Sequence, residues 1–172
     1  MLRLFLLLWL FPTLAFAKPA APVWSAPIAE LTFGVFCTLQ PTGQSEAPGT
    51  TSGFIHTIAT APSFDWPGQT TLPASLGLAF GVQARSAKGT AVPYAEVRVY
   101  RPGQTAPDVW FTDFSDTDPS FVFFRFDTEP ELTPGIWVIE AWDGENRLYR
   151  VEFDVVPYAQ SPGIAQACGG TS

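Results

Sequence analysis

Residues 136–156 read IWVIEAWDGENRLYRVEFDVV, which is two runs of alternating apolar and polar residues on either side of Asp143-Gly144. Asp-Gly is a turn dipeptide suited to positive φ, so the stretch predicts an antiparallel hairpin of residues 136–142 and 147–156. Alternation of this quality indicates one buried and one solvated face. The inner face would carry Trp137, Ile139 and Ala141 opposite Tyr149, Val151, Phe153 and Val155.

Outward from this hairpin, five more short segments have strand character: residues 30–40, 52–60, 76–84, 95–101 and 120–127. The chain has 17 proline and 14 glycine residues among its 172, and their scatter leaves little room for long helices. About seven strands at this spacing predict an all-β fold, an immunoglobulin-like antiparallel β-sandwich. A small closed β-barrel is the alternative.

The segment 76–84 has two unlike faces. Leu76, Leu78, Phe80 and Val82 would point one way, and Gly77, Ala79 and Gly81 the other. A strand with a nearly bare face usually lies against another backbone or a loop on that side. We therefore expect a further chain segment to cover the glycine face.

The first 17 residues have the features of a cleavable secretory signal peptide. Arg3 precedes an apolar run, and Ala15-Phe16-Ala17 is a small-x-small cleavage site. The run is shorter than the roughly 20 apolar residues that span a bilayer. Cleavage before Lys18 predicts export to the periplasm or the cell exterior, with no membrane span in the mature form. The domain plan is then a signal peptide (1–17), a Pro/Ala-rich arm (18–29), one β-sandwich domain (30–156) and an irregular tail (157–172).

Charge narrows the range of partners. Cleavage would remove Arg3 and leave eight basic residues against 16 acidic ones. An acidic surface repels phosphate groups, so nucleic acid and anionic lipid are poor candidates.

The two cysteines, Cys37 and Cys168, predict a single disulfide in an exported protein. It would tie the tail to the first strand and close a loop of 132 residues, counting both ends. The chain-entropy treatment gives at most roughly 5 kcal/mol of stabilisation for a loop of this size. A pair of free thiols is the alternative.

Several short motifs carry a resemblance to a known family. Leu72-Pro73-Ala74, Gly77 and Phe80-Gly81 are followed by Glu129-Pro130-Glu131-Leu132, Pro134-Gly135-x-Trp137, Leu148 and Phe153-Asp154-Val155. Over about residues 70–156 the chain resembles the bacterial family catalogued as domain of unknown function 3859. The resemblance implies a secreted or envelope β-sandwich with no assigned activity, and it brings no catalytic residues.

The same motifs have structural explanations. Pro134-Gly135 suits a tight turn that leads into a strand, since proline fixes φ and glycine accepts positive φ. Trp137 would then anchor the core. Glu131 could accept hydrogen bonds from the backbone of that turn.

Catalytic groups are scarce. His56 is the single histidine, no Gly-x-Ser-x-Gly elbow is present, and a zinc site would lack ligands once the cysteines are bridged. We expect no catalytic residues and no cofactor. Asp113, Asp116 and Asp118 lie in what reads as a loop and are a candidate calcium site, but their spacing does not fit the EF-hand pattern.

Four tryptophans, Trp24, Trp66, Trp110 and Trp142, fall at predicted loops, turns or strand ends. Such rings can stack on sugars or on protein partners, or they can cap the ends of the sandwich. Two hypotheses follow. One is a non-catalytic binding or assembly module of the cell envelope that acts on a protein partner. The alternative is a carbohydrate-binding module that uses these tryptophans. The sequence does not identify the envelope protein or glycan, nor the oligomeric state.

Overall fold

The computed structural model describes residues 18–60 and 62–169. The predicted signal peptide lies outside the described residues. Within them the chain forms two antiparallel sheets packed face to face, so the predicted sandwich is confirmed and the closed barrel is wrong. No helix in the described part is long and apolar enough to cross a membrane.

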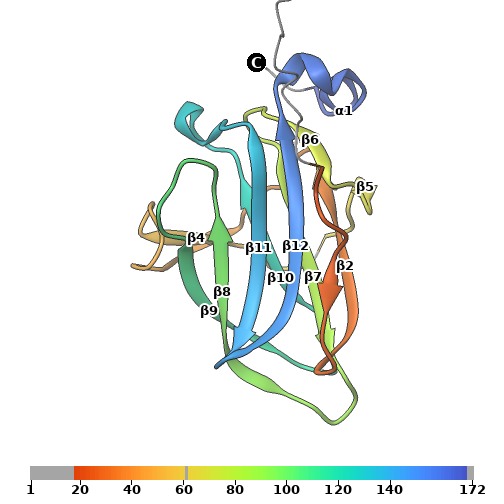
Figure 1. Cartoon of the computed structure of the whole chain (residues 1–172), viewed down its shortest axis with the longest axis vertical. Helices are drawn as coiled ribbons and strands as arrows, with labels where there is room; N and C mark the ends of the chain where they lie inside the picture. The colour runs from red at the N-terminus through yellow and green to blue at the C-terminus, as the bar shows by residue number, and fades with distance from the viewer. Residues whose placement is uncertain (1–17, 61, 170–172) are drawn as a thin grey trace, which may run out of the picture.

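The larger sheet runs in the order β1, β12, β11, β8, β9, with β6 added parallel to β12. Its strands are β1 (Val23–Trp24), β12 (Asn146–Val156), β11 (Gly135–Asp143), β8 (Val92–Tyr100), β9 (Asp108–Phe114) and β6 (Thr71–Pro73). The smaller sheet has the order β10 (Ser120–Arg125), β7 (Ala79–Ser86), β2 (Ile28–Phe36) and β5 (Trp66–Pro67). A separate hairpin pairs β3 (Gly43–Glu46) with β4 (Phe54–Thr57), and it lies beside β9 in Figure 1.

The predicted hairpin is the β11–β12 pair, and its register matches the expected inner face. Trp137 lies opposite Phe153, Ile139 opposite Val151, and Ala141 opposite Tyr149. All of these side chains are buried between the two sheets. Trp137 packs within 6 Å of the rings of Phe80, Phe124 and Phe126, as expected of a core anchor.

Three expectations about secondary structure are wrong. The sequence reading missed β9, an edge strand that contains Trp110 and Asp113. The tail is not irregular, because it forms a 3-10 turn (Tyr158–Gln160) and the helix α1 (Pro162–Ala167). The segment 52–60 contributes β4 to the small hairpin and not to either sheet of the sandwich.

The predicted disulfide is present. Cys37 follows β2, Cys168 ends α1, and their Cα atoms are 4.6 Å apart. Ile164 and Ala165 of α1 are buried, and Ile164 belongs to the main core. The tail is therefore held by apolar packing as well as by the covalent bond. The N-terminal arm is also held, since Val23 and Trp24 pair with β12 and the Ala20 N–H donates to Glu152 at 2.8 Å.

The bare face of β7 is covered, as expected, by the segment that connects β2 to β5. Gly81 lies opposite Gly34 of β2, and a Cβ on Gly34 would come within 3.0 Å of the Phe64 ring. A second apolar cluster forms on this outer side of the smaller sheet from Phe36, Leu39 and Ala79, with Phe64 and Phe123 packed against it. Gly77 differs from the expectation, because its φ of +82° places it in a turn before β7.

Gly81 has no room for a side chain, whereas Gly163 has. Replacing each by alanine should therefore change the free energy of unfolding in opposite directions. A Cβ at Gly81 would lie 2.3 Å from the Val122 carbonyl oxygen, whereas Gly163 in α1 has nothing within 4 Å. We expect Gly81→Ala to lower the free energy of unfolding by about 1–3 kcal/mol. Gly163→Ala should raise it slightly, by up to about 1 kcal/mol, because alanine favours helix. Urea unfolding of the oxidised protein measures both, and equal effects would contradict the packing argument.

Candidate functional site

The β3–β4 hairpin lies over the side of the sandwich where β9 of one sheet and β10 of the other come together (Figure 1). Beneath it is a cavity of about 300 Å³, which we call the hairpin cavity. Its walls come from the hairpin (Thr50, Ser52, Phe54, Ile55, His56), from β9 (Asp108, Trp110), from β10 (Phe123, Phe124, Arg125) and from the turn after β10 (Asp127, Thr128, Glu131).

A triplet of polar side chains joins β4 of the hairpin to the end of β10. His56 Nε2 lies 2.5 Å from Asp127 Oδ2, and Arg125 Nη1 lies 3.2 Å from Asp127 Oδ1. Glu131 fixes the position of Asp127, because its Oε2 accepts the backbone N–H groups of Asp127 and Thr128 at 2.7 and 2.9 Å. This is the backbone of the preceding turn, and not of Pro134-Gly135 as the sequence suggested.

Asp108 holds the tip of the hairpin to the start of β9, and it also forms an ion pair. Arg101 Nη2 lies 2.8 Å from Asp108 Oδ2, and both side chains are only 9% exposed. Asp108 Oδ1 also accepts the Thr51 N–H at 2.6 Å and the Thr51 hydroxyl at 2.7 Å. Next to this contact the Val109 N–H donates to the Gly49 carbonyl at 2.9 Å. The hairpin is therefore tied to both sheets by buried or half-buried polar contacts.

These contacts use the groups that catalysis would need. His56 and Asp127 form a dyad of the kind that can orient a general base. However, the hydroxyls of Thr50 and Ser52 donate to the backbone carbonyl of Phe54, and His56 Nδ1 is buried without a hydrogen-bond partner among the described residues. The arrangement can bind the hairpin to the sandwich, and it presents no nucleophile bonded to the imidazole.

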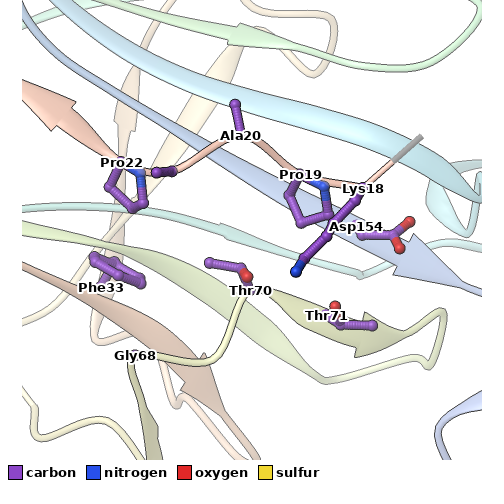
Figure 2. Close-up of a pocket in the computed structure, with 10 residues that line it drawn as sticks. Lys18, Pro19, Ala20, Pro22, Phe33, Gly68, Thr70, Thr71 and Asp154 are labelled. Carbon is purple, nitrogen blue, oxygen red and sulfur yellow. The ribbon is translucent and has the colours of Figure 1, made fainter.

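On the opposite side of the domain the N-terminal arm crosses a second hollow (Figure 2). Lys18 to Pro22 form one wall, and Phe33, Thr70, Thr71 and Asp154 face them. Burial raises the pKa of the Asp154 carboxyl. This hollow combines one carboxylate, the Lys18 amine and two hydroxyls, which is a sparse polar set.

The outer face of the β8–β9 pair carries the most exposed large apolar side chains among the described residues, one on each strand. Tyr94 is 82% exposed and Phe111 is 61% exposed. They line one hollow together with Pro93, Thr112 and Asp113. We call these five residues the β9 edge patch.

Tyr94 also has an unusual backbone. Its φ is +63°, and it is the only non-glycine residue in the described part with positive φ. It lies where the β8–β9 register shifts between Val92 and Ala95, which marks a bulge. The left-handed conformation costs about 1–3 kcal/mol for a residue of this kind.

The four tryptophans do not share a face. Trp66 and Trp110 lie opposite Val35 and Val97, so they point inward, and both pack against the main core. Trp110 is thus an inward residue within a strand and not a loop residue. Trp142 lies on the outer face, between the guanidinium groups of Arg98 and Arg147 at 4.7 and 5.6 Å from its ring centroid. Trp24, which is 51% exposed, lies on β1 at the other edge of the sheet.

The three aspartates are separated by the structure. Asp113 is in β9, whereas Asp116 and Asp118 follow that strand. Asp116 accepts the Gly89 N–H at 2.7 Å, and Asp118 accepts the Thr117 hydroxyl at 3.1 Å. Within residues 18–60 and 62–169, no three His, Cys, Asp or Glu side chains are grouped so as to hold a metal ion.

Sequence reasoning missed Tyr94, Arg125 and Asp127. The pairing of Asp127 with His56 joins residues 71 positions apart, and no local pattern signals it. Tyr94 was overlooked because the predicted strand began at residue 95. The proline just before it, Pro93, was the available signal of an interrupted strand.

The buried pair of Asp108 with Arg101 and a surface pair of Glu30 with Arg85 predict different effects for the same carboxylate-to-amide change. Asp108→Asn would leave Arg101 buried without its counter-charge, and we expect a loss of about 3 kcal/mol in the free energy of unfolding. Glu30→Gln is the matched control, because Glu30 pairs with Arg85 at the surface, where the side chains are 62% and 37% exposed. That change should cost less than about 1 kcal/mol. Chemical denaturation tests both, and similar losses would refute the assignment.

No family model matches the chain, and no curated protein matches it. Among solved structures, an immunoglobulin-like protein from Pseudomonas aeruginosa is similar, with 17% sequence identity and a TM-score of 0.48. The similar region covers 80% of this chain and 98% of that one.

Proposed function

We propose that this chain is an exported, non-catalytic β-sandwich module that binds a protein partner through the β9 edge patch. The observation that carries the proposal is Tyr94, a large side chain that is 82% exposed on a backbone with φ of +63°. Strain that persists without a packing gain is characteristic of functional surfaces. Aromatic side chains are also the residues that interfaces favour.

Export is supported by the Cys37–Cys168 disulfide, since such bonds persist in oxidising compartments. The signal-peptide features of residues 1–17 support it independently. The acidic surface and the resemblance to an envelope family agree with this setting. The partner is then a protein of the periplasm or the cell exterior.

A protein partner is favoured over a glycan for a geometric reason. Sugar-binding platforms place aromatic rings side by side, and here Trp66 and Trp110 point into the core while Trp142 lies between two arginines. The β9 edge patch joins exposed rings to a strand at the edge of its sheet. Such an edge can offer backbone hydrogen bonds as well as apolar contact.

If Tyr94 is strained for the sake of binding, its replacement by glycine should separate stability from function. Tyr94→Gly removes the penalty of positive φ, so we expect the free energy of unfolding to stay level or rise by up to about 1 kcal/mol, while partner binding is lost. Thermal and urea unfolding measure the first effect. A clear loss of stability would show that the exposed ring has a structural role that contradicts the proposal.

Partner binding itself can be tested with a photo-crosslinking amino acid placed in the exported protein. We expect the probe at Phe111 to capture a reproducible protein in intact cells, and Tyr94→Ser to abolish that capture. The matched control is the probe at Val23, which is 47% exposed on the opposite edge of the sheet. The proposal would be abandoned if position 111 captured nothing, or only what position 23 captures.

A further inference from the structure

We propose that the partner presents an extended, basic segment, and that this segment adds as a strand to the uncovered end of β9. The inference rests on the proposed function and specifies its chemistry. It starts from the position of β9 at the end of the larger sheet, where it pairs with β8 on one side only.

The direction of the backbone groups follows from one hydrogen bond. The Val109 N–H donates to Gly49 of the hairpin tip, so at Val109 the backbone points away from β8. In an antiparallel ladder this direction repeats at every second residue. Phe111 and Asp113 therefore also turn their N–H and C=O groups to the open edge. Apart from its ladder with β8, β9 makes no backbone hydrogen bond other than the one from Val109 within the described residues.

The hairpin tip covers only the first half of this edge. A Cβ on Gly49 would lie 2.4 Å from the Val109 carbonyl oxygen, which shows how closely the tip approaches there. Beyond Trp110, the edge between β9 and β10 borders a groove of about 360 Å³. A short added strand would therefore pair with residues 111–114, after the point where the tip ends.

Side chains of an added strand would alternate between an apolar hollow and a groove of mixed polar and apolar lining. Those on the outer side would reach the hollow beside Tyr94 and Phe111. Those on the inner side would reach the groove, whose apolar lining includes Ile58, Trp110 and Phe121. Contact on both faces of a strand gives the sequence selectivity that backbone hydrogen bonds do not provide.

Charge identifies the kind of segment. Asp113 lies in the patch, and Asp116 and Asp118 follow the strand, yet none of the three forms an ion pair within the described residues. Lysine or arginine on the segment would balance this charge. A second copy of this acidic chain would bring like charge to the same place, so it is the less favourable occupant.

The test is a selection from a library of random 12-residue peptides on the oxidised, exported protein. We expect enriched peptides with alternating apolar residues and an excess of lysine and arginine. Their affinity should fall at least about tenfold with Phe111→Ser, and also with Asp113→Asn, Asp116→Asn and Asp118→Asn combined. Val23→Ser is the control and should leave the affinity unchanged. An absence of enriched peptides, or binding that ignores the aspartate changes, would overturn the basic-segment assignment.

Backbone N-methylation of the best peptide tests strand addition separately. Methylation at alternate residues removes the N–H groups that would donate to β9, so we expect losses of about tenfold or more with a period of two. If methylation at every position left the affinity unchanged, strand addition would be overturned. Crosslinking at position 111 could still support the proposed function. Sedimentation of the protein without peptide gives the other decisive outcome. If the protein formed a dimer and Phe111→Ser dissociated it, the occupant of the β9 edge would be a second copy of this chain and not a partner segment.

Discussion

Two close approaches, of the β2–β5 connection to Gly34 and of β10 to Gly81, determine how the rest of the domain is arranged. These two glycines lie opposite each other on β2 and β7, and a side chain at either would meet backbone atoms at 2.3–2.4 Å. Their small size lets Phe64 and Phe123 pack on the outer face of the smaller sheet, where a second apolar cluster forms. The outer faces of a sandwich usually lie in solvent. Here the apolar cluster covers part of one outer face, and it holds the connection between β2 and β5 against the smaller sheet along one path.

That path brings the β3–β4 hairpin to the side where the two sheets meet. Once there, the hairpin is held at its tip by Asp108 and Arg101 and in its middle by the contact of His56 with Asp127. Both contacts involve residues far apart in sequence, and both use groups that would otherwise be available for chemistry. The same placement covers Val109 and leaves residues 111–114 at the open edge. The packing on the smaller sheet thus decides which part of the edge of the larger sheet stays uncovered.

Local alternation predicted much of this fold. All seven expected segments contain strands, and the register of β11 with β12 agrees residue by residue with the expected inner face. Strand β9 escaped detection because its inward positions are Asp108, Trp110, Thr112 and Phe114, which mix polar and apolar side chains. An edge strand with an inward position at Asp108 that binds Thr51 and Arg101 does not need a continuous apolar face, so periodicity does not report it. The prediction that Trp110 lies at a loop, a turn or a strand end was wrong for the same reason.

Uncovered strand edges are a hazard, because they can pair with further copies of the same chain. Natural proteins restrain them with bulges, with charge and with a loop that covers the edge. All three devices are present around β9: the bulge at Tyr94, the carboxylate of Asp113 and the cover that the hairpin tip places over Val109. Restraint by itself does not explain the two exposed rings, because Tyr94 and Phe111 add apolar surface to the very edge that the other features protect. A negative charge next to exposed rings repels an acidic copy and attracts a cationic segment. The combination therefore serves selection of a partner better than simple avoidance of aggregation.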